Sequence, residues 1–130
     1  MRIENSKKTN TYKMENKNEI VDVSFKLALL IIEFSEELES RKKFVIAQQL
    51  LRSGTSIGAN IRESQSAESK ADFTHKLKIA HKEAIETEYW IELVKANKNY
   101  PNPGEKLESL LLSVLKILNK IISSSKKKIS

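Results

Sequence analysis

The stretch RSGTSIGANIRESQSAESKADF, residues 52–73, carries the glycines, hydroxyls and amide that a phosphate-binding loop uses. Such a loop follows a strand and reads G-x-x-x-x-G-K-[ST], so that backbone amides and a lysine surround the phosphates. Here Gly54 and Gly58 stand one residue too close together, and Ala59 and Asn60 follow where a lysine is needed. The stretch therefore does not predict a nucleotide-binding loop.

Metal and nucleophilic chemistry have little support in the sequence. A di-iron four-helix bundle needs Glu-x-x-His on two helices, and the nearest match, Asp72-x-x-His75, occurs once. His75 and His81 are six residues apart, so on a helix they point to different faces and cannot chelate one ion. The chain also lacks an elbow motif that would expose a nucleophilic serine. We predict no enzymatic activity, no cofactor and no small-molecule substrate.

The acidic residues Glu83, Glu86 and Glu88 have the chemistry of general acids or bases, but a structural role is the stronger prediction. Glu86 lies four residues after Lys82, which is the spacing of a surface ion pair on a helix. Four further residues fit ion pairs between helices on either side of the glycine-bearing stretch: Arg52, Arg62, Glu63 and Glu83.

Composition sets the broad class of the protein. A chain of 130 residues predicts one domain, and three glycines with two prolines leave little room for the turns of a many-stranded β protein. The absence of cysteine excludes a disulfide framework. The first residues contain no apolar signal region, and the run 20–32 is interrupted by Asp22 and Lys26. We therefore expect a cytoplasmic protein without a membrane partner.

The formal net charge of +6 is concentrated at the two ends of the chain. Residues 1–18 hold five basic and two acidic side chains, and residues 126–128 are three lysines. The remaining stretch, 19–122, holds 15 basic and 15 acidic residues. A basic isoelectric point alone is therefore weak support for a phosphate-binding surface on the folded body.

Apolar residues recur three and four positions apart along most of the chain, which places them on one face of a helix. The clearest repeat covers three heptads, as shallow helix-on-helix packing requires: Phe73, Leu77, Ala80, Ala84, Thr87, Ile91 and Val94. We predict an all-α protein whose single domain, residues 19–122, is a four-helix bundle. Its helices should span about 19–39, 43–66, 70–98 and 103–122, between a disordered basic tail at 1–18 and a basic tail at 123–130.

Residue types mark the starts of two of these helices. Ser69 with Asp72 three residues later resembles a capping box. Asn102 followed by Pro103 fits an N-cap and a proline at the first helical position. Because the linker 98–101 is short, the last two helices should be antiparallel neighbours.

The glycine-bearing stretch keeps the helical rhythm, because Ala47, Leu50, Gly54, Ile57 and Ile61 alternate three and four residues apart. Two glycines inside a helix cost about 1 kcal/mol each relative to alanine, so closer packing must offset them. We predict a continuous helix with a small-residue packing seam, in which Asn60 forms a hydrogen bond across the contact. The seam comprises Ser53, Gly54, Ser56, Gly58 and Asn60.

The 70–98 helix has more apolar surface than one core contact needs. Tyr89 and Trp90 adjoin its main stripe, and Ile79, Ile85 and Leu93 add a second apolar line. A helix that is apolar around more than half of its circumference has more than one partner surface. We predict self-association with Tyr89 and Trp90 as candidate anchors, and a wider core is the alternative.

The run from Ser53 to Val94 resembles a bacterial family of four-helix-bundle proteins named after the intervening sequences of 23S ribosomal RNA. Ser64 and His81 depart from the residues expected there, which are alanine and leucine. The matching positions are Arg52-Ser53, Ser56-Ile57, Asn60-Ile61, Glu63, Ser69, Asp72-Phe73, Leu77, Ile79-Ala80, Glu83-Ala84 and Glu86-Thr87-Glu88-Tyr89-Trp90.

The resemblance implies an antiparallel up-down-up-down bundle assembled into a homopentameric ring. It also implies kinship to the accessory proteins of diversity-generating retroelements, which form similar rings and bind a reverse transcriptase and RNA. The resemblance implies no reaction. The family name reports where some genes lie and does not make the product a ribosomal component.

Our main hypothesis is a non-enzymatic oligomeric helical bundle that binds nucleic acid, RNA in particular, or a ribonucleoprotein, without base specificity. A ring would add up weak basic patches from all of its subunits. The alternatives are a scaffold or accessory subunit for a protein such as a reverse transcriptase, and a purely structural protein. The candidate phosphate contacts, which as solvated charge would otherwise only keep the protein in solution, are Arg41, Lys42, Lys43, Lys126, Lys127 and Lys128.

Overall fold

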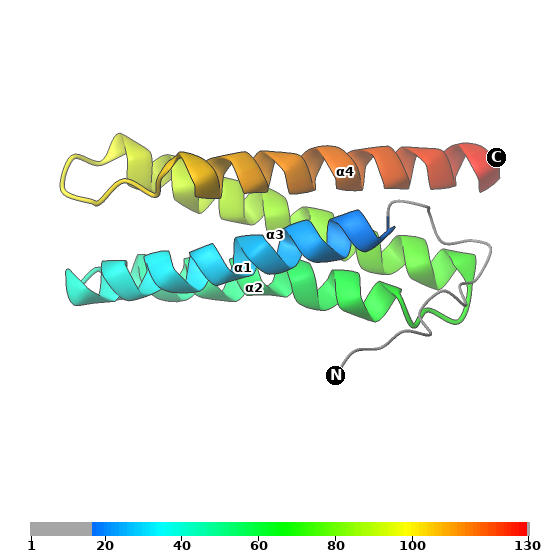
Figure 1. The fold of residues 1–130 in the computed structure, drawn as a ribbon, viewed down its shortest axis with the longest axis horizontal. Coiled ribbons are helices and arrows are strands. Elements are labelled where there is room, and N and C mark those ends of the chain that lie inside the picture. The colour runs from blue at the N-terminus through cyan, green and yellow to red at the C-terminus, as the bar shows by residue number, and fades with distance from the viewer. Residues whose placement is uncertain (1–16, 130) are drawn as a thin grey trace.

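The computed structural model describes residues 17–129, and all regular elements in that range are α-helices. They are α1 (Lys17–Ser40), α2 (Phe44–Ser64), α3 (Lys70–Ala96) and α4 (Glu105–Ile129). The helices lie lengthwise beside one another, with the α1–α2 and α3–α4 connections at one end and the α2–α3 connection at the other (Figure 1). The predicted all-α, four-helix architecture is confirmed. The tail predicted at 1–18 falls outside the described residues, except that positions 17 and 18 already belong to α1.

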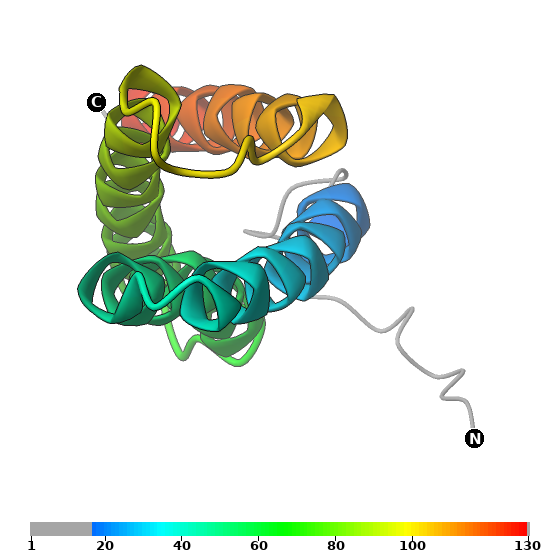
Figure 2. The ribbon, with the colours of Figure 1, turned by 90° about the vertical axis from the view of Figure 1, so that its left-hand side faces the viewer.

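Each helix packs against two others. α1 and α3 both lie beside α2 and α4, whereas along the described chain the backbones of the two diagonal pairs stay apart. Figure 2 shows this arrangement from one end, with α3 joining α2 to α4 and α1 on the side away from α3. α2 approaches α1 and α3 over more of its length than α4 does. The bundle therefore has one closely packed side, α1–α2–α3, and one more widely spaced side at α4.

The apolar stripes read from the sequence form the core. All seven residues of the α3 repeat, from Phe73 to Val94, are buried, which confirms that prediction. In α2, Ala47, Leu50, Ile57 and Ile61 are buried with the glycine at position 54 in register. The helical spacing of these residues brings them to one face, so the four stripes meet in a single core.

The start of α3 is capped by side chains. The hydroxyl of Ser69 accepts a hydrogen bond from the Asp72 backbone N–H at 3.0 Å, as the sequence predicts. The carboxylate of Asp72 accepts from the backbone N–H of Glu68 at 3.3 Å rather than from that of Ser69. The reciprocal half of the expected capping box is thus displaced by one residue.

The boundaries of α4 differ from the prediction at both ends. Asn102 Oδ1 accepts from the Gly104 N–H at 2.7 Å, and Gly104 has φ +94°, so the chain turns before the helix begins at Glu105. Pro103 therefore precedes the helix instead of opening it. The backbone stays helical to Ile129, so the segment 123–129, including Lys126–Lys128, continues α4 rather than forming a separate tail.

Candidate functional site

The small-residue seam of α2 lies between α1 and α3. Gly54 is buried, and a Cβ placed there would lie 2.8 Å from Ile31 Cγ2 and 2.9 Å from Ile31 Cγ1. Real Cβ atoms do not approach other atoms so closely, so the position needs glycine for α1 to pack where it does. The close approach here is between the α2 backbone and an isoleucine side chain.

The other face of the seam joins α2 to α3 through two buried hydroxyls. Ser53 and Thr87 are both fully buried, and their Oγ and Oγ1 atoms share a hydrogen bond of 2.9 Å. Thr87 Oγ1 also lies 2.8 Å from the carbonyl oxygen of Glu83. Because both residues are fully buried between α2 and α3, neither hydroxyl is exposed to a substrate.

The C-terminal part of the seam is looser than predicted. A Cβ at Gly58 would meet Ser24 Oγ at 3.6 Å and the Ser24 carbonyl oxygen at 3.7 Å, which is ordinary contact. Ser56 and Asn60 are half-buried, and Asn60 Nδ2 donates to the Ser56 carbonyl oxygen at 3.0 Å, one turn earlier in the same helix. The prediction of a hydrogen bond across the contact is therefore wrong, because the Asn60 amide donates to a carbonyl oxygen of its own helix.

A charged cluster closes the outer side of the α2–α3 contact. Arg52 Nη1 lies 3.3 Å from Glu83 Oε1, and Arg52 Nη2 pairs with Glu86 Oε2. The same carboxylate oxygen of Glu86 accepts a hydrogen bond from Trp90 Nε1 at 3.0 Å. The hydrogen bond from Arg52 lowers the pKa of Glu86 below its ordinary value, and that from Trp90 adds to the effect. Glu86 is therefore held ionised as a structural anchor.

Of the two remaining residues predicted to form ion pairs, one does and one does not. Glu63 of α2 pairs with Lys76 of α3 at 2.9 Å. The guanidinium of Arg62 instead lies over the ring of Phe25 in α1, 5.7 Å from its centroid. Arg62 thus binds an exposed aromatic ring rather than a carboxylate.

α3 presents an apolar line to solvent. Ile85, Tyr89 and Leu93, which we call the α3 ridge, are 46%, 54% and 40% exposed and lie four residues apart. Trp90 is half-buried, and its ring centroid is 5.3 Å from that of Tyr89. Of the two predicted anchors, Tyr89 therefore lies on the ridge, whereas Trp90 packs at its base.

A second apolar line lies on α1. Phe25, Leu29 and Ile32, which we call the α1 ridge, are 51%, 47% and 39% exposed. They are spaced four and three residues apart, so they share one helix face. These three residues were not predicted from the sequence, although their spacing beside the buried α1 stripe indicates a second apolar face.

The basic residues of the first turn are partly neutralised by their surroundings. Arg41 Nη2 lies 3.4 Å from Glu37 Oε2. Lys42 has φ +64°, which shapes the turn between α1 and α2, and Lys43 Nζ lies 4.8 Å from the centre of the Tyr100 ring. These three residues lie together, as expected, but two of their charges already contact groups of the protein.

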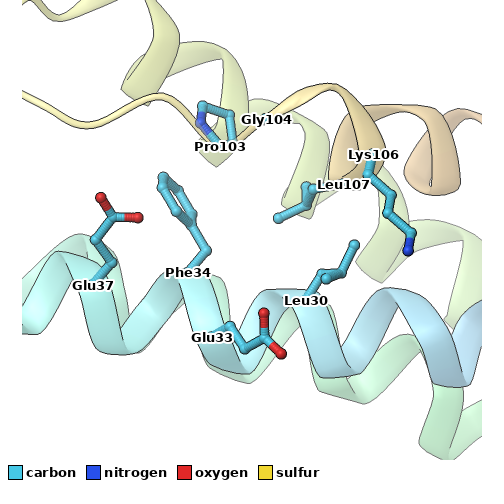
Figure 3. Close-up of a pocket in the computed structure, with 8 residues that line it drawn as sticks. All are labelled: Leu30, Glu33, Phe34, Glu37, Pro103, Gly104, Lys106 and Leu107. Carbon is cyan, nitrogen blue, oxygen red and sulfur yellow. The ribbon is translucent and has the colours of Figure 1, made fainter.

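The depression between α1 and the start of α4 has a volume of about 170 Å³ and is open to solvent. Figure 3 shows Leu30 and Phe34 pointing from α1 toward Leu107 and Pro103, with the carboxylate of Glu37 at the edge. The floor is apolar core surface and its charged groups are solvated. The depression has no enclosed pair of carboxylates for acid–base work.

Neither a metal cluster nor a membrane span is built by the described residues. Histidine and acidic side chains do not gather in threes anywhere between positions 17 and 129 in an arrangement that could hold a metal ion. Within the same part of the chain, every helix is too polar or too short to cross a bilayer.

The sequence and the fold of the chain are similar to those of known proteins. Residues 16–121 match the family described as 23S rRNA-intervening sequence protein. A crystal structure of a protein with unknown function from the S23 ribosomal protein family of Bacteroides thetaiotaomicron is similar, with 44% sequence identity and a TM-score of 0.75. The alignment covers 79% of this chain and 97% of that one. No curated protein matches the chain. The chain therefore belongs to the family of 23S rRNA-intervening sequence proteins.

Proposed function

We propose that this protein is a non-enzymatic homo-oligomer, a ring of up-down-up-down four-helix bundles that binds RNA through its phosphate backbone. The observation that carries the proposal is the pair of exposed ridges on α1 and α3. A helical protein that needed no partner would cover side chains such as Phe25 and Tyr89, because apolar surface is favourably removed from water.

The position of the two ridges supports a ring. α1 and α3 are diagonal in the bundle, so their ridges face in different directions. Packing the α1 ridge of one copy on the α3 ridge of the next would form a head-to-tail interface, and such interfaces generate closed rings when the rotation closes. The family resemblance implies five subunits.

RNA is the partner that the charge of the chain favours. Each chain carries a formal net charge of +6, and a ring would multiply that charge around one axis. Lysine and arginine contacts to phosphate release counterions and give affinity without base specificity. The paired hydroxyls of Ser53 and Thr87 and the ion-paired Glu86 support a role without catalysis.

The assembly is tested by measuring the mass of the protein in solution by light scattering over a range of concentrations. Introducing a charge into each ridge, with Phe25→Glu or Tyr89→Glu, should dissociate the oligomer into monomers while the helical circular dichroism is kept. Gln48→Glu, at an exposed position of α2 outside both ridges, is the control. A parent protein that stays monomeric at every concentration contradicts the ring.

RNA binding is tested by titrating the purified protein with a labelled structured RNA at about 50 mM and about 200 mM salt, the range over which phosphate contacts lose most affinity. We expect tight binding at low salt, a steep loss at high salt, and little difference between RNA sequences. Failure to bind at low salt removes the RNA half of the proposal. An oligomer that persists without binding RNA would favour the scaffold alternative, in which the ridges serve a protein partner.

A further inference from the structure

Charge is segregated along α3. From Phe73 to Lys82 the helix holds three lysines and two histidines without an acidic residue. From Glu83 to Glu92 it holds four glutamates without a lysine or arginine. One helix therefore has a basic half beside the α2–α3 connection and an acidic half toward the α3–α4 connection.

α4 repeats the same division in the opposite chain direction. Its first turn contains Glu105 and Glu108, whereas from Ser109 to Ile129 it holds five lysines and no acidic residue. α4 runs back along α3 (Figure 1), and Lys95 Nζ lies 2.7 Å from Glu108 Oε1 near the α3–α4 connection. The basic halves of α3 and α4 therefore lie toward the same end of the bundle, on two neighbouring helices.

Four lysines on this side of the bundle are available to a ligand. Lys78 and Lys82 are exposed on α3, and Lys116 and Lys120 are exposed on α4. Each pair is four residues apart, so its members share a helix face. None of the four forms an ion pair with another described residue, unlike Lys76, which is held by Glu63.

The connection between α1 and α2, which lies at the other end of the bundle, has a weaker positive electrostatic potential. Arg41 is paired with Glu37, and Glu33, Glu36 and Glu39 lie on the same stretch of α1. Opposite charges so close together cancel much of the potential that an approaching polyanion would feel.

We infer that the phosphate-binding surface consists of Lys78, Lys82, Lys116 and Lys120, on the outer faces of the basic halves of α3 and α4. This inference rests on the proposed RNA binding and names its site. Lysines four residues apart rise about 6 Å along each helix, and α3 and α4 are neighbours in the bundle. A nucleic-acid backbone that crosses the outer faces of these two neighbouring helices would therefore meet cations on both.

The test compares two variants that each lose four positive charges. The site variant is Lys78→Gln, Lys82→Gln, Lys116→Gln and Lys120→Gln. The matched control is Arg41→Gln, Lys42→Gln, Lys98→Gln and Lys106→Gln, all exposed and all near the other end of the bundle. Both are titrated with the same labelled RNA hairpin over a salt series, after circular dichroism and light scattering show unchanged helicity and mass.

We expect the site variant to bind more weakly, with a log–log salt slope shallower by about 3, or about 0.7 for each lost phosphate contact. The control should keep a slope within about 1 of the parent value, since its residues make no phosphate contact. On a heparin column, which presents a sulfated polyanion, the site variant should elute at lower salt than the control.

The outcomes separate the two claims. If the parent protein does not bind the RNA, the proposed function fails, and the site fails with it. If the parent binds but both variants weaken binding equally, only the inferred site is overturned, because net charge then explains the effect. A greater loss of RNA affinity in the control variant would instead place the phosphate-binding surface near the α1–α2 connection.

Discussion

α2 and α4 occupy diagonal positions and contact the same two helices, but the side chains at their contacts differ in size. Where α2 crosses its neighbours it places two buried small residues, Ser53 and Gly54, against Thr87 and Ile31. α4 fills its contacts with large aliphatic residues, of which Leu118 is fully buried. α2 thus combines buried aliphatic residues with small ones that allow a close approach, whereas α4 makes its contacts mainly with large aliphatic residues.

The difference shows how each side limits function. At Ser53 and Gly54, small residues bring α2 so near to α1 and α3 that the contact is filled by atoms of the three helices. One turn later the packing is looser, and an open depression of about 200 Å³ lies between α1 and α2 beside Gly58. On α4, leucines hold the helix at a greater distance and leave its outer face free for lysines. The two sides therefore differ in how closely their helices pack.

Truncating a large core residue of α4 should have the greatest effect. Leu118→Ala removes a fully buried side chain and should lower the free energy of unfolding by about 2–5 kcal/mol, since the widely spaced side cannot close the cavity. Denaturant unfolding followed by circular dichroism, at one protomer concentration, measures this. Leu112→Ala, at a side chain 52% exposed, is the control and should change stability by about 0.5 kcal/mol or less. Equal losses in both variants would contradict the described packing of α4.

Adding a methyl group at Gly54 of α2 should have the next largest effect on stability. Gly54→Ala places a methyl group 2.8 Å from Ile31 Cγ2. Overpacking costs about 1–3 kcal/mol, which exceeds the gain of about 1 kcal/mol in helix propensity, so the variant should be less stable by up to about 2 kcal/mol. Thermal and denaturant unfolding measure the change.

The matched control for this substitution lies one turn away. Gly58→Ala meets Ser24 at 3.6 Å, where a methyl group fits, so helix propensity should make this variant more stable by about 0.5–1 kcal/mol. Opposite signs at positions 54 and 58 would establish how local the close approach is. The same sign at both would contradict it.

The smallest effect concerns the Arg52–Glu86 pair and its pH dependence. The pKa of Glu86 is lowered in the folded state, so its contribution is present above the ordinary value of 4.5 and is lost as the pH falls through the folded pKa. Glu86→Gln should lower stability at neutral pH by about 1 kcal/mol or less, because the pair is partly solvated.

The pH series provides the check on that pair. The difference in unfolding free energy between the parent and Glu86→Gln should shrink as the pH falls well below 4.5. Glu92→Gln, an exposed carboxylate on the same helix, should show no comparable trend. A difference that does not change with pH would show that the hydrogen bond to Trp90, rather than the charge, carries the effect.

Local pattern was sufficient for much of the fold. The α3 stripe and the Ser69 cap follow from spacings of three and four residues, and the structure confirms both. Helix ends were harder to predict. The Asn102 side chain forms a turn with Gly104 where an N-cap was expected, and α4 continues to Ile129 although its composition resembles a tail.

The candidate site was predictable only in part. The sequence indicates that Arg52 and Glu83 lie near the seam, but it assigned Glu86 to Lys82 because a partner on the same helix is the simplest choice. The structure brings Glu86 to Arg52 and Trp90 instead. The expected contact of Asn60 across the seam failed for a related reason, because a carbonyl oxygen of its own helix was closer.

By itself, the sequence determined four helices, their buried faces and the need for small residues in α2, because these depend on interactions within a few residues along one helix. Only the tertiary structure decided which charges meet between helices and which apolar residues stay exposed. It also decided that the basic halves of α3 and α4 lie toward the same end of the bundle. Such properties depend on how separate helices are placed against one another, and residues distant in the chain acquire neighbours only through that packing.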